Sequence, residues 1–360
     1  MLATTYILTI IYAWLGKNKR SFWFFCALLL MIIVNTSVKY ADFENYEFYF
    51  NGFNEGIYTI KETGLPIGWY YLCLLFGTLG LSYRAMVVFI IAVSMYLIHS
   101  RIKKYDIKEG IFWGLFIIFP GLIQCVQIRF FLGTTIVFWG LIPLLNNEKN
   151  SLIKYIASVL IAYIFHASCM IFIVFAFLPL FNHFAKKRVM LICLAATIVI
   201  YFGLSYIPEL ISPFIPSNRV ERYFQSETSV TTFSWFIQIL MVWLIGFLIA
   251  GILKKKIDNT KDEYMMKISN NIKNIISLLF VTIPFLAFDR NFHRFLELGY
   301  MLIFILLAYY WKKMKLNGES KLVLMSISLI LILGITYIYT PIETVIIPFF
   351  TFSGFHSMFL

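Results

Sequence analysis

Several polar and ionisable residues lie inside or beside long apolar stretches of the 360-residue chain. Such groups are costly near membrane depth, so each is a candidate functional residue. Arg129 follows Gln124 and Gln127, and this combination favours a polar cavity over an arginine that only extends to the lipid head groups. His166, two residues before Ser168, is a candidate general base because the pKa of histidine lies near neutral pH. Taken alone, a single histidine favours the alternative, a structural role at a turn.

A second polar group precedes a later apolar segment and contains Asp289, Arg290, His293, Arg294 and Glu297. If a helix begins here, the i,i+4 spacing puts Arg290 and Arg294 on one side. Two guanidinium groups held in this way suit a diphosphate, because each can donate paired hydrogen bonds to phosphate oxygens. The equally weighted alternative is a local ion network, in which Arg294 pairs with Glu297 or Arg290 with Asp289.

Two further polar stretches, residues 39–65 and 208–232, are predicted to be outer loops between apolar segments. The first combines carboxylates with many aromatic residues, which either bind sugars by stacking and hydrogen bonding or form an interfacial belt. The second contains two arginines that either bind phosphate or are simply solvated. The candidates in these stretches are Asp42, Tyr46, Glu62, Arg219 and Arg222. The pair Asp42 and Glu44 is too short a pattern to predict a metal site.

The composition shows what kind of protein must position these residues. Hydrophobic residues make up 61% of the chain and charged residues only 13%, which excludes a water-soluble enzyme. At about 20 apolar residues per crossing, the length leaves no room for a sizeable soluble domain. The sequence therefore predicts an all-α polytopic membrane protein with a single transmembrane domain over residues 1–360.

The positive charge, +12 in net, lies in short clusters between apolar segments, which is typical of cytoplasmic loops and not of nucleic-acid binding. The clusters lie at 17–20, 101–104, 186–188, 254–256 and 312–315. With these inside, the stretches 39–65, 208–232 and 289–294 and both termini are expected outside. The five cysteines all fall in apolar stretches, which predicts packing rather than disulfides or metal binding. No nucleotide-binding or zinc-protease motif occurs, and no cofactor is expected.

Thirteen apolar segments can be read along the chain. They are 2–15, 21–38, 66–82, 84–100, 110–119, 122–145, 152–165, 167–181, 189–207, 233–253, 274–288, 295–311 and 321–339. External termini require an even number of crossings, so about 12 segments are expected to cross. We predict that residues 66–82 do not cross but are re-entrant or interfacial, because a crossing there would put the cluster at 101–104 outside.

Four short motifs occur in order along the chain. They are D-F-E-N-Y at 42–46, E-T-G at 62–64, I-R at 128–129 and F-H-A-S at 165–168. With the late arginines Arg290 and Arg294, they resemble the EpsG family of exopolysaccharide (capsular) and O-antigen polymerases, the Wzy-type enzymes. The chain departs from the family pattern at Phe130, where the family has glutamine, and in the second motif, which lacks a proline.

The resemblance implies a fold similar to multi-spanning lipid-phosphate-dependent (GT-C-like) glycosyltransferases and a bacterial cytoplasmic membrane location. It implies transfer of a growing glycan from undecaprenyl diphosphate to an undecaprenyl-diphosphate-linked oligosaccharide on the outer face. The implied partners are membrane lipids, a chain-length regulator and a flippase, with no nucleic acid. The implied residues are Asp42, His166 and Arg129 for catalysis; Arg129, Arg290, Arg294, Arg219 and Arg222 for the diphosphate; and Gln127, Tyr46, Glu62 and His293 for the sugar or cavity.

A lipid-linked oligosaccharide flippase or other transporter remains the alternative, because it also needs a cationic cavity. A membrane O-acyltransferase that uses His166 as its base is less favoured, because the sequence shows no acyl-donor site on the inner face.

Overall fold

The computed structural model describes residues 2–16, 21–37, 41–182, 186–203, 206, 233–287, 290–313 and 318–339. Within these residues the chain is helical and has no strand, as the sequence predicts. This part of the chain contains six helical spans that are long and apolar enough to cross a membrane, and six shorter apolar helices. These features fit an integral membrane protein. The number of crossings, and the non-crossing role of residues 66–82, stay predictions.

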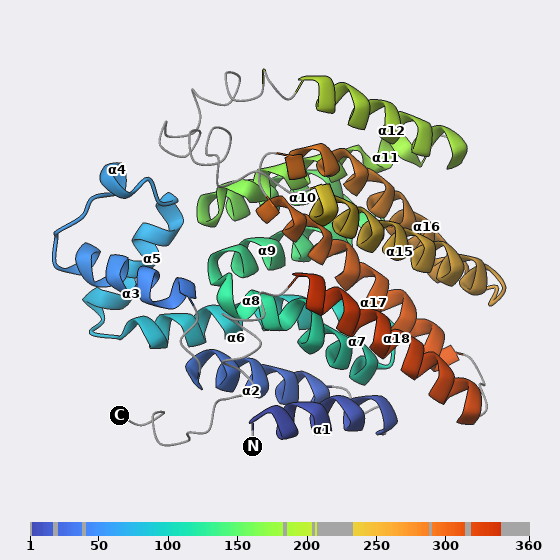
Figure 1. Cartoon of the computed structure of the whole chain (residues 1–360), viewed down its shortest axis with the longest axis horizontal. Coiled ribbons are helices and arrows are strands. Elements are labelled where there is room, and N and C mark those ends of the chain that lie inside the picture. Colours follow the sequence, from blue (N-terminus) through green and yellow to red (C-terminus); the bar gives the residue numbers. More distant parts are fainter. Residues whose placement is uncertain are drawn as a thin grey trace. The chain divides into compact units, whose positions relative to one another are not determined.

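The chain divides into two compact units (Figure 1). Unit 1 comprises residues 1–143, 153–170 and 307–360. Its helices are α1 (Leu2–Leu15), α2 (Phe22–Ser37), α3 (Ala41–Asn54), α4 (Ile60–Thr63), α5 (Ile67–Thr78), α6 (Tyr83–Ile102), α7 (Glu109–Phe116), the π-helix η1 (Ile117–Gly121), α8 (Leu122–Val126), α9 (Ile128–Leu145), α10 (Ser151–Phe165) and α18 (Gly318–Tyr339). Within it, α2 packs against α6 and α7, α1 packs against α7, and α18 packs against η1.

The stretch 39–65 is largely helical, although the sequence predicts a loop there. Phe43, Phe50 and Phe53 are buried, and their spacing of seven and three residues puts them on one face of α3. Asp42 and Glu44 lie in the first turn, where the helix dipole favours negative charge. In Figure 1, α3, α4 and α5 lie together at one end of unit 1, where α6 begins, and α3 packs against α5 and α8.

The helix break before Arg129 lies later than the sequence predicts. Pro120 and Gly121 lie in η1, where the backbone of Phe119 is non-helical. A second break follows at Gln127, with φ −95° and ψ 50°, and α9 begins at the next residue. The single helix predicted over 122–145 is therefore two helices, and Arg129 lies in the first turn of α9.

The break after α10 lies where the sequence predicts it. Helix α10 ends at Phe165, and the 3-10 helix η2 (Ala167–Phe177) follows. Helix α9 lies close to this turn, because Gly133 leaves no side chain in the way. A Cβ atom at Gly133 would lie 2.6 Å from the Cys169 sulfur and 3.6 Å from the His166 Cβ.

Unit 2 comprises residues 144–152 and 171–306. Its helices are α11 (Leu178–Phe181), α12 (Lys186–Gly203), α15 (Phe233–Asp258), α16 (Glu263–Leu278), the 3-10 helices η5 (Leu279–Ala287) and η6 (Arg290–Arg294), and most of α17 (Phe295–Lys313). Helix α15 packs against α16, and η5 packs against α12 and η6. A buried hydrogen bond joins α17 to α15: the Tyr300 hydroxyl donates to the Val242 carbonyl at 2.6 Å.

Candidate functional site

Arg129 is the centre of a polar cluster in unit 1. Its side chain is only 9% exposed. The guanidinium Nη2 donates a hydrogen bond to the Tyr46 hydroxyl at 2.7 Å. The same group lies 4.5 Å from the Tyr46 ring centroid and 5.7 Å from the Trp69 ring centroid, so both rings also make cation–π contacts with it.

The guanidinium group has unused hydrogen-bonding capacity. Its Nε and Nη1 atoms are buried and make no hydrogen bond among the described residues. None of the ion pairs formed by these residues includes Arg129. A buried charge without a partner is costly, and buried donors normally find acceptors. The arrangement therefore suits an anionic ligand that supplies the missing acceptors.

The backbone adds positive potential at the same place. The Gln127 carbonyl accepts the first hydrogen bond of α9, from the N–H of Phe131 at 2.8 Å. The N–H groups before Phe131 in the first turn therefore have no acceptor inside the helix, and the dipole of this 18-residue helix is positive at this end. Arg129 lies in that turn, so side chain and backbone both favour a negative group.

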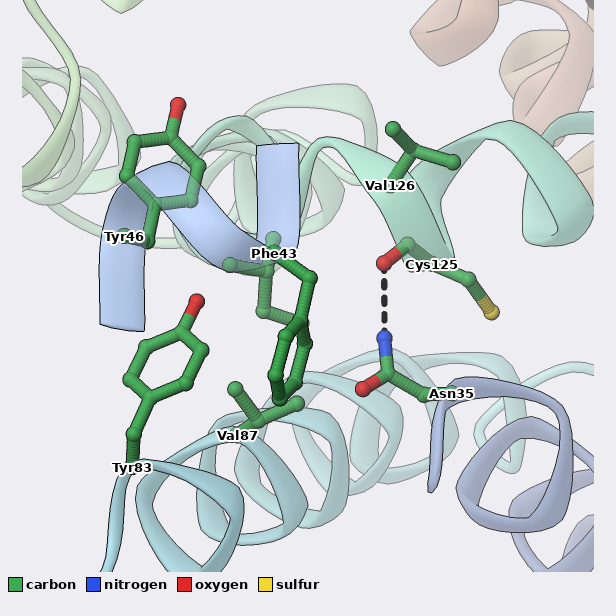
Figure 2. Close-up of a pocket in the computed structure, with 8 residues that line it drawn as sticks. Asn35, Phe43, Tyr46, Tyr83, Val87, Cys125 and Val126 are labelled. Carbon is green, nitrogen blue, oxygen red and sulfur yellow. Dashed lines mark hydrogen bonds between the residues drawn. The ribbon is translucent and has the colours of Figure 1, made fainter. Parts of the chain in front are cut away.

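A small cavity lies beside Tyr46. Its lining includes Asn35, Tyr46, Tyr83 and Ile128, and the empty space, counted with its opening, is about 230 Å³. Figure 2 shows the hydroxyl groups of Tyr46 and Tyr83 pointing the same way, while Asn35 Nδ2 donates to the Cys125 carbonyl at 2.6 Å. The space that a water molecule can enter is only about 10 Å³, so the closed part of the cavity has room for about one water molecule.

His166 lies beside the first turn of α9. Its ring packs edge to face on Phe130 with 5.3 Å between centroids. Its Nδ1 atom lies 2.7 Å from the Ser168 hydroxyl oxygen, a hydrogen bond that fixes the ring orientation. The structure thus brings His166 to the helix end that carries Arg129, as a base acting beside an anion site requires.

The other predicted residues of unit 1 differ in their surroundings. Asp42 is half-buried on α3, four residues before Tyr46 and so on the same helix face. The Gln127 side-chain oxygen is buried and unpaired among the described residues. Glu62 instead caps α4: its carboxylate accepts from the Thr59 N–H at 2.7 Å and the Thr59 hydroxyl at 2.9 Å. These bonds hold the pKa of Glu62 below its usual value, and its sugar-binding role stays a prediction.

His293 and Arg294 belong to unit 2, at the end of η6. His293 is buried, and its ring packs edge to face on Trp235 at 5.5 Å. The segment Arg290–Arg294 is a 3-10 helix, in which residues four apart are separated by about 120° around the axis. This segment is therefore not the α-helix that the i,i+4 spacing assumes; the side chain of Arg290 lies outside the described residues, so the placement of both guanidinium groups on one side stays a prediction.

Several predictions lie outside the described residues. They concern Arg219, Arg222, Asp289 and the side chain of Arg290. Among the described residues, no group of three or more His, Cys, Asp or Glu side chains is placed to hold a metal ion. The five cysteines, all among the described residues, form no disulfide with one another.

Trp69 is a site residue that the sequence did not reveal. It is fully buried on α5, its ring lies 5.6 Å from that of Tyr46, and its indole Nε1 has no partner among the described residues. Gly68 lets α5 approach the end of α10 closely: a Cβ atom there would lie 2.7 Å from Cγ2 of Ile164 and 2.9 Å from its carbonyl oxygen. The only sequence signal is the glycine and tryptophan beside each other in the segment predicted not to cross the membrane.

Comparisons with known proteins complete this description. No curated protein and no solved structure matches the chain. The sequence model of the EpsG family matches residues 20–351, which include every motif and every candidate residue discussed above. The chain therefore belongs to the EpsG family.

Proposed function

We propose that the protein is a polysaccharide repeat-unit polymerase of the bacterial cytoplasmic membrane, acting on the outer face as Wzy-type O-antigen and capsule polymerases do. It transfers a growing glycan from undecaprenyl diphosphate to a lipid-linked oligosaccharide repeat. Membership of the EpsG family favours a membrane protein that polymerises polysaccharide. The observation that carries the proposal is Arg129, a buried guanidinium at a helix N-terminus with two unpaired nitrogen atoms.

In the reaction, the acceptor hydroxyl oxygen forms a bond to the anomeric carbon of the growing glycan. The bond between that carbon and the diphosphate oxygen breaks, and undecaprenyl diphosphate leaves with the electron pair. Negative charge therefore grows on the diphosphate in the transition state. A preorganised guanidinium group in a poorly hydrated site stabilises this charge without having to reorganise.

The acceptor hydroxyl must lose its proton to a base. His166 is the better placed candidate, because it packs on Phe130, the residue after Arg129. Asp42 is the other candidate, since it shares a face of α3 with Tyr46, which contacts Arg129. Two further proposals are separate from the Arg129 cluster: Arg219, Arg222, Arg290 and Arg294 bind diphosphate, and His293 binds sugar.

The test is elongation by purified protein supplied with lipid-linked repeat units. The wild type should produce chains of several repeats, and Arg129→Ala should lower the rate about 10²-fold or more, as loss of one oxyanion donor does. In a deletion strain, single repeats should accumulate on the outer face of the membrane. Repeats trapped on the inner face would contradict the proposal and indicate a flippase.

A further inference from the structure

The cluster around Arg129 contains hydrogen-bond donors that no described residue uses. Arg129 has two such nitrogen atoms, and Trp69 has its indole Nε1. The Tyr46 hydroxyl oxygen already accepts from Arg129, which leaves its own hydrogen to be donated. These three side chains come from three elements, α9, α5 and α3, and their rings and guanidinium group are in mutual contact.

The unused groups on these three side chains are all donors, whereas the unpaired acceptor oxygens in this part of unit 1, Oδ1 of Asn35 and Oε1 of Gln127, lie on other side chains. An arginine and an indole cannot accept a hydrogen bond at all. A sugar hydroxyl both donates and accepts, so a sugar site needs acceptors among its side chains. A phosphate oxygen of a diphosphate carries no hydrogen and accepts several bonds, and a charged acceptor strengthens each of them.

We propose that Tyr46 and Trp69 donate hydrogen bonds, together with Arg129, to one phosphate group of the lipid diphosphate. Tyr46 then binds the phosphate rather than the sugar, and Trp69 is an additional binding residue. The assignment of the phosphate to a lipid diphosphate rests on the proposed function. The donor set itself requires only an anion with several acceptor oxygens.

The local structure explains how Trp69 is held. Helix α5 has only 12 residues and begins after Pro66, and Gly68 allows its first turn to lie against the carbonyl group of Ile164. This contact fixes the turn that carries Trp69 to the end of α10, next to His166. The donor set and the candidate base are therefore held by the same contact between α5 and α10.

The experiment measures equilibrium binding of three probes to the full-length protein in lipid nanodiscs. The probes are inorganic phosphate, inorganic pyrophosphate and geranyl diphosphate. Trp69→Phe keeps an aromatic ring and removes the N–H, and Tyr46→Phe removes only the hydroxyl. Each should raise the Kd for geranyl diphosphate about 10-fold to 100-fold, the range expected for a hydrogen bond to a charged group.

Trp113→Phe is the matched control. Trp113 is also buried in unit 1 with an unpaired indole nitrogen among the described residues, but it packs on Phe24 and Phe116, away from Arg129. It should bind the probes as the wild type does. Thermal unfolding of each variant separates a lost hydrogen bond from a damaged fold, and a loss of affinity in a variant with wild-type unfolding supports the proposal.

Unchanged binding by Trp69→Phe and Tyr46→Phe, with binding lost in Arg129→Ala, would overturn the donor set. Pyrophosphate binding as tightly as geranyl diphosphate would overturn the assignment to a lipid diphosphate. If Trp69→Phe weakens probe binding but the wild type elongates no glycan, the anion site is supported and the polymerase function is refuted. If the wild type elongates glycans but substitutions at Arg129, Trp69 and Tyr46 leave probe binding unchanged, the proposed phosphate site is refuted and the polymerase function is not.

Discussion

Arg129→Met replaces the buried guanidinium group with an uncharged chain of similar length. The variant loses the hydrogen bond to Tyr46, about 1.5–3 kcal/mol, and the cation–π contacts, about 2 kcal/mol. It also removes the cost of burying a charge, several kcal/mol, and of leaving two donors unpaired, about 1–3 kcal/mol each. The free energy of unfolding should therefore stay the same or rise by a few kcal/mol.

Activity should change in the opposite direction. If Arg129 stabilises the leaving diphosphate, Arg129→Met should elongate lipid-linked repeats about 10²- to 10³-fold more slowly than the wild type. The assay compares thermal unfolding of the purified proteins with the elongation rate per folded molecule. If Arg129 serves the reaction at a cost to stability, Arg129→Met should be at least as stable as the wild type and almost inactive.

Arg101→Met is the control for loss of a guanidinium group elsewhere in unit 1. The Arg101 guanidinium lies 3.8 Å from the Trp139 ring centroid, at the end of α6. This variant should lose about 0.5–2 kcal/mol of stability and keep the elongation rate per folded molecule. Destabilisation of Arg129→Met by 3 kcal/mol or more would refute the reasoning, because it would show that the Arg129 charge is fully paired within the protein.

Three further predictions concern the surroundings of Arg129. Thr59→Ala removes one of the two hydrogen bonds to the Glu62 carboxylate and Glu62→Gln weakens both, so both variants should speed amide exchange in α4 at neutral pH, Glu62→Gln more than Thr59→Ala. Because the pKa of Glu62 is lowered, the cap is complete above the usual pKa of about 4.3, and the difference between Glu62→Gln and the wild type should vanish only as the pH falls through the lowered pKa. Loss of elongation in Glu62→Gln alone would instead indicate sugar binding. Gly68→Ala should lower elongation at least 10-fold, since its Cβ would press α5 away from α10, and a wild-type rate would contradict this. Ser168→Ala should shift the pH profile of elongation, because it removes the hydrogen bond that orients the His166 ring. His166→Gln should lower the elongation rate about 10²- to 10⁴-fold at every pH. Identical pH profiles for the wild type and Ser168→Ala would argue against a base at His166.

The helices that carry apolar runs could be predicted from sequence because apolar composition alone marks them. Helix α3 could not be found in this way, since it alternates carboxylates with aromatic residues and has low overall hydrophobicity. Its helical period was present in Phe43, Phe50 and Phe53, and a search for periodicity rather than for apolar runs would have detected it.

The break before Arg129 shows a different limit. Proline and glycine at 120 and 121 are strong local signals for a helix end, and the backbone is indeed irregular there. Gln127, the break directly before α9, carries no such signal in its residue type. The packing of α8 between α2 and α3 depends on contacts distant in sequence, which a local pattern does not contain.

The candidate site was predictable to the extent that charged residues are rare in apolar surroundings. Arg129 and His166 stood out for this reason, and the structure places them at the same end of α9. Trp69 did not stand out, because a tryptophan in an apolar segment normally indicates packing. Its role depends on an unpaired N–H, and whether a donor is paired is a property of the folded neighbourhood.

The 3-10 helix η2 changes how far its segment reaches. A 3-10 helix rises about 2.0 Å per residue and an α-helix about 1.5 Å. The 11 residues of η2 and the four of α11 therefore extend about 28 Å, whereas the 15 residues of α10 extend about 22 Å. The first length nearly equals the roughly 30 Å thickness of the hydrocarbon layer, while α5, at 12 residues, extends only about 18 Å. Residues 167–181 thus span more of that thickness than α5 does, and which of these shorter helices cross the membrane stays a prediction.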